Sequence, residues 1–427
     1  MILTEKQYVE IDAQISSTLW FNSRCSVRIW NRLVEHRETA KKQNEPSGYI
    51  TQKKQLPIWK KEDERLKQPS SQQLQEVVKE FHGAWKSFFE KRNHGDTDCR
   101  PPSFRSSRNF YSMHYPQRYN SFEIEGGTLK LAFGKNRKEW LTITLRENDY
   151  SNVKTVRLCF DDVLKQFCVC LHREEVEAKP KAEGLRLYFD PGCKTTLTGI
   201  GSDGKIYEYD INPLRKVNMS SYKLIDELIS RRDKKQKKSW QWRRLNKRIA
   251  RLWRKVKYRT KAYLHTLANR IFASHPNLSK ILVGDWNKQE TLADAGYVFV
   301  NKRINRAVQN NNPVNMLVTI LSYKGKLRHG VSVEKFDERG STRTCSQCNY
   351  IHEEGVSPAV RLFTCPECGF TYPRDWQSGL NFLRQFESAV WSGLEGHYPS
   401  RSVRKVLAPF SLKAQRTICT ASFALAS

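Results

Sequence analysis

With 427 residues, 38% of them hydrophobic and 11% aromatic, the chain is long and apolar enough for two or three globular domains. Lysine and arginine number 74 against 44 acidic residues, and the net charge of +30 favours a polyanionic partner, so nucleic acid is the expected ligand. The first residues lack the basic-then-apolar pattern of a signal peptide, and no run approaches the ~18 apolar residues of a membrane span. We therefore expect a cytoplasmic protein with no membrane partner.

The N-terminal region is predicted to begin with a strand and a helix within its first forty-odd residues, followed by a connector from about Asn44 to Lys61. A second helix begins at Ser70 or Ser71, either of which can cap it. Its apolar residues recur at helical spacing: Leu74, Val77, Val78, Phe81, Trp85 and Phe88. This face should pack within a small helical domain.

Arginines alternate with aromatic residues between Cys99 and Tyr119, and these residue types grip phosphates and stack on bases. Tyr111 and Tyr115 are our candidate nucleic-acid contacts from this segment. The alternative is a surface loop whose rings are tucked into a core. The alternating runs that follow predict a small β-barrel or sheet: 122–125, 129–133, 140–145, 156–160 and 167–171.

A new unit begins near Gly184, with a first strand that ends in Asp190. The elements expected after it are strands at 197–201 and 205–209, a basic helical region, a strand at 279–285, a helix at 313–324, a strand at 331–336 and, beyond an insertion, a helix at 375–387. This order is that of an RNase H-like domain.

The basic helical region holds sixteen lysines and arginines between Arg231 and Lys261, against one acid, Asp233. An apolar stripe at helical period leaves the other faces cationic, and like charges repel unless something negative lies beside them. A merely solvated helix is the alternative. The candidate nucleic-acid contacts are Arg243, Arg244, Lys247, Arg248, Arg251, Arg254 and Lys255.

The insertion carries two Cys-x-x-Cys pairs separated by 16 residues, Cys345 with Cys348 and Cys365 with Cys368. Their number and spacing are those of a closed tetrahedral zinc site, which can fold a segment too small to bury its own core. We expect a structural Zn²⁺.

Three motifs make the sequence resemble the TnpB (OrfB-type) proteins of bacterial insertion sequences and their relatives, the compact type V CRISPR effectors. They are Phe189-Asp190-Pro191-Gly192, the string from Arg339 to Cys348, and Arg374-Asp375 with Asn381 after it. The resemblance implies an α/β RNase H-like RuvC nuclease domain with an inserted zinc ribbon, preceded by a wedge β-barrel with a helical recognition insertion. The expected boundaries are 1–180 for the wedge with its recognition lobe (about 20–100), 181–341 and 374–392 for the nuclease domain, 342–373 for the ribbon, and 393–427 for a tail that, lacking periodicity, should be mobile.

The same resemblance implies two catalytic Mg²⁺ ions held by converging carboxylates. Asp190 and Asp375 match the first and third positions of the family's set. The second, usually a glutamate on the fourth strand, is Gly284 here. Asp285 points to the opposite face of that strand unless the strand bulges, so we expect Glu338, at the end of the neighbouring strand, to replace the missing ligand. The alternatives are a surface role for Glu338 beside Arg339 and a weakened or inactive nuclease.

The function that follows is an RNA-guided DNA endonuclease encoded by an insertion sequence, with a guide RNA from the element's own end and a double-stranded DNA target cut next to a short flanking motif. Alternatives are a CRISPR effector with an array-derived guide, a nuclease-inactive guided repressor, a DNA-strand transferase and an RNA-binding protein that does not bind DNA. The sequence names no protein partner.

Overall fold

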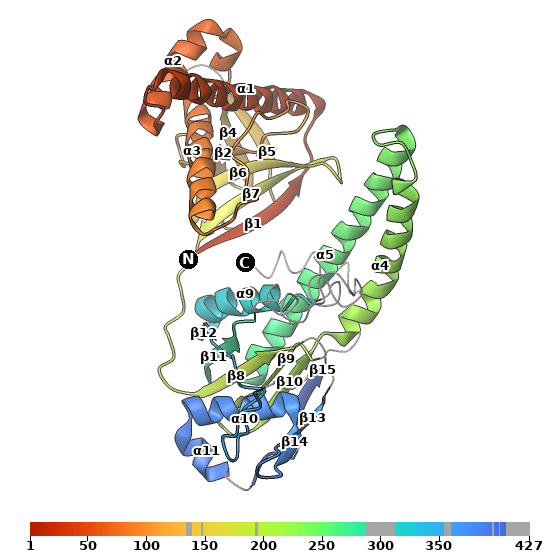
Figure 1. Cartoon of the computed structure of the whole chain (residues 1–427). Coiled ribbons are helices and arrows are strands. Elements are labelled where there is room, and N and C mark those ends of the chain that lie inside the picture. Colours follow the sequence, from red (N-terminus) through yellow and green to blue (C-terminus); the bar gives the residue numbers. More distant parts are fainter. Residues whose placement is uncertain are drawn as a thin grey trace. The chain divides into compact units, whose positions relative to one another are not determined.

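The structure, a computed structural model, describes residues 1–133, 139–146, 148–192, 195–286, 312–353, 360–394, 397–400 and 402–406. The chain forms two compact units that divide between Glu175 and Val176, and each unit is described by itself (Figure 1). Among the described helices none is long and apolar enough to cross a membrane.

The N-terminal unit opens with β1 (Ile2–Val9) and α1 (Ala13–Gln43). Asp12 starts α1 by accepting a hydrogen bond from the backbone N–H of Ile15. The predicted strand and helix are thus confirmed. The predicted connector is wrong, because residues Tyr49–Glu62 form α2. Pro57 lies inside this helix and removes one backbone hydrogen bond, which is why the sequence pattern favoured a connector.

The third helix, α3 (Ser71–Asn93), is capped by Ser70, one of the two predicted caps, whose hydroxyl accepts from the Gln73 N–H. α1, α2 and α3 share a core in which the rings of Trp30 and Phe81 meet edge to face at 5.2 Å. A short 3₁₀ turn at Glu64–Lys67 joins α2 to α3. The predicted small helical domain is therefore present between β1 and the later strands.

Six further strands complete this unit: β2 (Met113–Tyr115), β3 (Phe122–Glu125), β4 (Thr128–Phe133), β5 (Glu139–Thr144), β6 (Val153–Asp161) and β7 (Gln166–Glu174). They form two sheets, ordered β1-β7-β6-β2 and β3-β4-β5, whose inner residues share one core. All five predicted strands are confirmed. Closure of the strands into a barrel stays a prediction.

The second unit is built on a six-stranded sheet of order β12-β11-β8-β9-β10-β15 (Figure 1). Its strands are β8 (Leu185–Pro191), β9 (Leu197–Gly201), β10 (Ile206–Asp210), β11 (Leu278–Gly284), β12 (Ser332–Phe336) and β15 (Ser402–Val406). β8, β9 and β10 form an antiparallel meander, whereas β11 pairs parallel with β8 and β12 parallel with β11. The predicted order of strands and helices is confirmed.

The strand β15 corrects one prediction. Residues 393–427 were expected to be a mobile tail, but residues 388–394 form α11 (Ser388–Leu394), and β15 pairs in parallel with β10 at the sheet edge. A five-residue edge strand carries too little pattern to be found from sequence. Residues 395–396, 401 and 407–427 of that expected tail lie outside the described residues.

The helices of the second unit pack on opposite faces of this sheet. α5 (Trp240–Ser274) and α9 (Val314–Lys324) cover one face, where Leu187 and Phe189 of β8 are buried. α10 (Arg374–Phe386) covers the other, where Tyr188 is buried. Because successive strand residues point to opposite faces, Asp190 at the end of β8 belongs to the α10 face. The insertion before α10 holds the two-stranded ribbon β13 (Leu362–Thr364) and β14 (Thr371–Pro373).

The predicted basic region, Arg231 to Lys261, covers the end of one helix, a turn and most of the next helix. α4 (Asn212–Asp233) and α5 are joined by a turn and pack as an antiparallel hairpin, with Leu245 and Ile249 of α5 set against Ile225 and Leu228 of α4 (Figure 1). The apolar stripe predicted from the sequence is the face that makes this contact.

Candidate functional site

Three neighbouring strands of the second unit end at one edge of the α10 face. Val283 of β11 pairs with Phe189 of β8, so Gly284 and Asp190 are the next residues on the two strands. Gly284 in turn pairs with Phe336 of β12, and Glu338 lies two residues beyond. The period of two carries Glu338 to the same face as Phe336, which packs against Phe382 of α10.

The side chain of Glu338 occupies the space above Gly284. A Cβ atom placed on Gly284 would lie 1.6 Å from Oε2 of Glu338 and 2.5 Å from its Cδ. Only a residue without a side chain allows this carboxylate to fold back over β11. The structure therefore brings Glu338 to the place where the resemblance predicts a glutamate from β11 itself.

The other acids of this region are engaged elsewhere. Asp285 is exposed and accepts a 2.6 Å hydrogen bond from Nζ of Lys335. Glu334 forms an ion pair of 2.8 Å with Lys280, and the exposed Asp337 pairs with Arg339 at 3.0 Å. Of the described acids that follow β11 and β12, Glu338 is the one whose side chain lies over Gly284.

Asp375 reaches the site from α10. It lies in the first turn of that helix, and its carboxylate is 3.6 Å from a guanidinium nitrogen of Arg361. α10 packs on the sheet with Gly379 facing β9, where a Cβ would lie in ordinary van der Waals contact, 3.4 Å from the Cβ of Ile200. This packing brings the start of α10 near enough to the end of β8 for the charge of Asp375 to act on Asp190.

The electrostatics of the carboxylates depend on burial and on one another. Burial, together with the charge of Asp375, raises the pKa of Asp190 to about 7. Burial, with the charges of Asp190, Asp285 and Asp337, raises the pKa of Glu338 to about 8. Such mutual repulsion of carboxylates is what a bound cation relieves.

A divalent cation suits this donor set. Oε2 of Glu338 is buried and has no hydrogen-bond partner among the described residues. Carboxylate oxygens are also the ligands that Mg²⁺ prefers. Among the residues that the structure describes, only the four cysteines bring three or more ligand atoms within 4.8 Å of one another, so the carboxylates do not form a cage for a single ion.

The four cysteines of the insertion converge as predicted. Their Sγ atoms all lie within 4.8 Å of one another, with 3.7 Å between Cys345 and Cys368 and 3.5 Å between Cys348 and Cys365. Tetrahedral coordination with Zn–S bonds of about 2.3 Å spaces sulfur atoms by roughly 3.8 Å. The geometry therefore fits one Zn²⁺ with four thiolate ligands.

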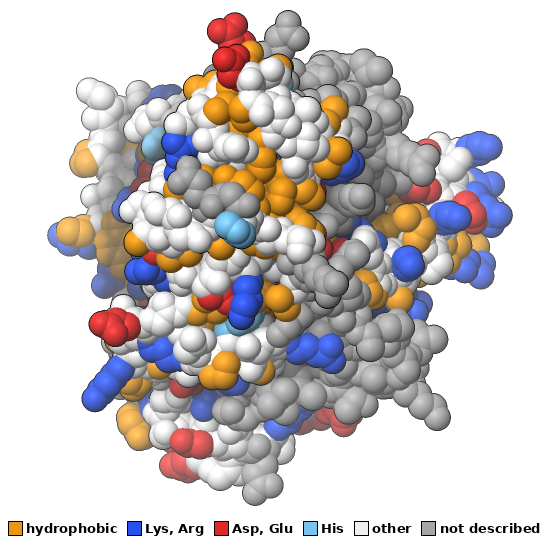
Figure 2. All heavy atoms as spheres, turned by 90° about the horizontal axis from the view of Figure 1, so that it is seen from below, with side chains coloured by type: hydrophobic (Ala, Val, Ile, Leu, Met, Phe, Trp, Pro, Cys, Tyr) orange, Lys and Arg blue, Asp and Glu red, His pale blue; other side chains and the backbone are white. Residues whose placement is uncertain are grey.

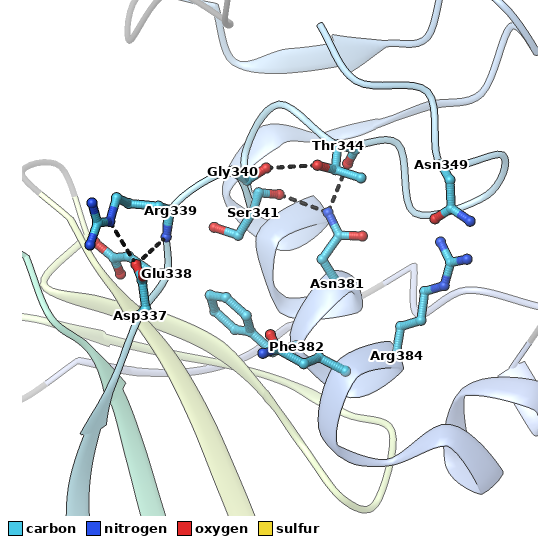
Figure 3. A pocket seen from close by; sticks show the side chains of 11 residues that line it. Asp337, Glu338, Arg339, Gly340, Ser341, Thr344, Asn349, Asn381, Phe382 and Arg384 are labelled. Carbon is cyan, nitrogen blue, oxygen red and sulfur yellow. Dashed lines mark hydrogen bonds and ion pairs between the residues drawn. The ribbon is translucent and has the colours of Figure 1, made fainter.

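A polar cavity of about 370 Å³ opens beside Glu338 (Figure 3). It lies between the loop after β12 and α10, and its lining includes Ser341, Asn349, Asn381 and Arg384. In Figure 3 the side chains of Arg384 and Asn349 point toward each other across one end of it. Neither Arg384 nor the cavity could be found from the sequence, because one wall comes from the loop after β12 and the start of the insertion and the other from α10.

The predicted basic contacts lie on the surface of the α4–α5 hairpin. Six of the seven are exposed and Arg254 is half-buried. Figure 2 shows Lys and Arg side chains gathered at the projecting right-hand edge, which is this hairpin. The exposed residues are Arg243, Arg244, Lys247, Arg248, Arg251 and Lys255.

The two tyrosines predicted to stack on bases are buried, so this prediction does not hold in the described fold. Tyr111 is 5% exposed and donates its hydroxyl to Glu80 at 2.6 Å, and Tyr115 is 1% exposed. The alternative, aromatic rings tucked into a core, is the correct interpretation of both residues. Phe104 and Tyr119 of the same segment are exposed.

The described fold is of the RuvC-containing compact-effector type. Two solved structures share this fold. The Cas12f1–sgRNA–target DNA complex matches with a TM-score of 0.56 and 13% identity over 87% of this chain and 82% of that one. The mini-RNA-guided endonuclease CRISPR-Cas_phi3 matches with a TM-score of 0.54 and 9% identity over 93% and 94%.

Two family models narrow the class. Residues 166–288 match the model described as "Probable transposase" (OrfB_IS605), and residues 315–382 match "Cas12f1-like, TNB domain". The two segments contain all three candidate carboxylates, Gly284 and the four cysteines. The chain is therefore similar, over these two segments, to OrfB-type transposon proteins and to Cas12f1-like proteins.

Curated relatives agree with this assignment. The chain is 29% identical over 242 residues to "Putative transposase R186" of Acanthamoeba polyphaga mimivirus, a match that covers 55% of this chain and 45% of the relative. It is 23% identical over 235 residues to "TnpB-like protein L79" of the same virus, covering 54% and 43%. The chain thus spans less than half the length of the curated relatives it matches.

Proposed function

We propose that the protein is an RNA-guided, magnesium-dependent DNA endonuclease of the TnpB type, with Asp190, Glu338 and Asp375 as the catalytic carboxylates. The observation that carries the proposal is the Glu338 side chain, which fills the space above Gly284 at the end of the strand next to Asp190. A displaced carboxylate restored to this place is expected of a working site, because an inactive one has no need of it.

In this proposal the three carboxylates share one task, which is to bind the metal ions. Asp190, at the end of the central strand, and Glu338 and Asp375, on either side of it, hold the metal ions with unprotonated oxygens. When bound, two Mg²⁺ ions activate a water molecule and stabilise the leaving oxygen of an in-line phosphodiester displacement. The raised pKa values of Asp190 and Glu338 mean that the protons leave as the metal binds.

Guide RNA and target DNA are the proposed partners. The exposed basic side chains of the α4–α5 hairpin support contacts to phosphates, and the +30 charge suits a protein that holds both nucleic acids. The two solved structures that share the fold are named as an sgRNA–target DNA complex and an RNA-guided endonuclease. Sequence choice then comes from guide pairing, with the guide transcribed from the element's own end; an array-derived guide is the alternative.

The four-cysteine site is proposed to hold a structural Zn²⁺ that folds the ribbon of residues 342–373. The ribbon buries few apolar side chains of its own, chiefly Cys345, Phe363 and Cys365, so metal binding supplies much of its folding free energy. The N-terminal unit is proposed to form the wedge domain with its helical recognition lobe.

A guided cleavage assay tests the proposal. The protein is co-expressed with the noncoding sequence downstream of its gene, and the purified complex is incubated in magnesium with a target library whose flanks are randomised. Asp190→Ala and Glu338→Ala should each abolish cutting while guided binding persists. Glu334→Ala, which removes an exposed acid paired with Lys280, is the matched control and should cut normally. Guided binding by wild type without cutting would favour the repressor alternative.

A further inference from the structure

The loop that carries Glu338 is held at its far end by helix α10. Glu338 begins a series of tight turns, in which the N–H of Ser341 donates to the Glu338 carbonyl at 3.1 Å and the N–H of Thr344 donates to the Gly340 carbonyl at 3.1 Å. The amide Nδ2 of Asn381 donates to the carbonyls of Ser341 and Thr344, both at 2.7 Å (Figure 3). Asn381 thus caps the turns that set the position of Glu338.

The Thr344 carbonyl also links α10 to the cysteine site. Nε2 of Gln377 donates to the Thr344 carbonyl at 2.7 Å, and Oε1 of Gln377 accepts from the hydroxyl of Ser346 at 2.8 Å. Thr344 and Ser346 are the two neighbours of Cys345. Gln377 and Ser346 are fully buried, so these bonds are not exchanged with solvent.

A second attachment joins the ribbon to the start of α10. The backbone N–H of Arg374 donates to the Arg361 carbonyl at 2.9 Å, and the Arg361 guanidinium lies 3.6 Å from Asp375. Asp375, Gln377 and Asn381 all lie on this one helix. A single helix therefore carries a candidate catalytic acid and grips both the Glu338 loop and the cysteine site.

We propose that Gln377 and Asn381 are positioning residues that couple the four-cysteine site to the carboxylates, so that zinc in one site and magnesium in the other favour each other's binding. The Thr344 carbonyl accepts from both amides and uses both its lone pairs. A shift of Cys345 moves this carbonyl, and Asn381 passes the shift to the turns that begin at Glu338. The coupling concerns the binding of the two metals and can be measured without cleavage. Its effect on DNA cutting rests on the proposed function.

The primary test measures zinc affinity with and without magnesium, in competition with a zinc-selective chelator. Coupling between two sites is reciprocal, so magnesium should tighten zinc by the same factor by which zinc tightens magnesium. We expect about a tenfold effect in the wild-type protein, the scale of one buried hydrogen-bonded carbonyl. This measurement does not depend on cleavage.

Isosteric variants identify the residues that carry the coupling. Gln377→Glu keeps the acceptor for Ser346 but replaces the donor to Thr344, and Asn381→Asp replaces both donors of Asn381. In each variant, magnesium should no longer change zinc affinity. Asn381→Asp should also raise the magnesium concentration needed for half-maximal cutting about tenfold, without changing guided DNA binding. Asn315→Asp, at an exposed position of α9, is the matched control and should keep the coupling. Thermal unfolding in the absence of magnesium verifies that each variant folds.

Two results overturn the inference: zinc affinity that does not respond to magnesium in wild type, or coupling that survives in both variants. Coupled metal binding in a wild-type protein that cuts no guided target contradicts the proposed function and leaves this inference standing. Guided cutting by a wild-type protein in which magnesium does not change zinc affinity supports the proposed function and contradicts this inference.

Discussion

The carboxylate of Glu338 lies where the side chain of any larger residue at Gly284 would have to be, 1.6 Å from the position of a Cβ atom. The two residues act as one unit. A glycine on β11 makes room for a glutamate that arrives from beyond β12, so the site can receive its acid from a different strand without a change in the sheet.

An alanine at position 284 should separate activity from stability. The clash falls first on the far end of the flexible Glu338 side chain, which can swing away at little cost in folding free energy. We expect Gly284→Ala to lower the cleavage rate at least about tenfold, since a misplaced catalytic group costs far more rate than its displacement costs stability. Cleavage kinetics and thermal unfolding on one preparation measure both quantities. Unchanged cleavage would mean that Glu338 is not needed in this place.

A glutamate at position 284 should replace the displaced one. Glu338→Ala empties the space above β11, and adding Gly284→Glu returns a carboxylate from the strand that carries it in the family this chain resembles. The double variant should cut at least about tenfold faster than Glu338→Ala alone, because a metal ligand is regained. Gly284→Gln with Glu338→Ala supplies the same volume without the charge and should stay inactive. Equal rates for the two double variants would contradict a ligand role.

The pH dependence of stability follows from the raised pKa values. Asp190 and Glu338 shift from ordinary values of 3.8 and 4.5 to about 7 and about 8, so the folded protein binds more protons than the unfolded chain between about pH 4 and 8. Stability without metal should therefore fall as pH rises through this window and level off above about pH 8.

Thermal unfolding from pH 5 to 9 measures this slope. Magnesium should flatten it and stabilise the protein most above pH 7, because the ions bind the ionised carboxylates. Asp190→Asn should lose its share of the slope. An identical profile for Asp190→Asn and wild type would show that Asp190 is not responsible.

Neutralising the hairpin should weaken nucleic-acid binding in a salt-dependent way. Replacing Arg244, Lys247 and Arg251 with alanine removes three exposed charges. If each contacts a phosphate, the slope of log affinity against log salt should fall by roughly three. Lys154→Ala, which removes a cation paired with Glu174 in the other unit, is the control. A wild-type slope in the triple variant would place the nucleic acid elsewhere.

One zinc ion per chain is expected by elemental analysis. Cys348→Ser and Cys368→Ser alter the two exposed ligands of the set, so neither change disturbs a buried core. Both should bind zinc much more weakly and expose the ribbon to proteolysis, because the metal supplies its folding free energy. Cys99→Ser, outside this cluster, should keep the zinc. Full zinc in the ribbon variants would contradict the assignment.

The strands of the second unit's sheet and their order could be predicted, because most of them are apolar runs bounded by acidic or turn residues. The sequence did not reveal α2, whose internal proline imitates a connector, or β2 and β15, which are only three and five residues long. Short strands carry too few alternations to be told from loops.

The site divides in the same way. Asp190, Asp375 and the cysteines belong to local motifs. Strand period set Asp285 aside, and Glu338 was proposed because it follows the neighbouring strand in a string that resembles the family's. The tyrosines at 111 and 115 have the residue type of a base-stacking surface, but only the fold shows that they point inward. The bonds of Gln377 and Asn381 could not be predicted, since their acceptors are backbone carbonyls whose positions depend on the folded insertion.

The parallel pairing of β15 with β10 has a consequence for synthesis on the ribosome. β10 is made early in the second unit, but β15 emerges only after the ribbon, α10 and α11. Until then the outer edge of β10 presents unpaired backbone groups, which is the kind of edge that pairs with other chains. A nascent or truncated chain ending at Leu394 is therefore exposed to aggregation at β10, and β15 covers that edge with a strand of only five residues.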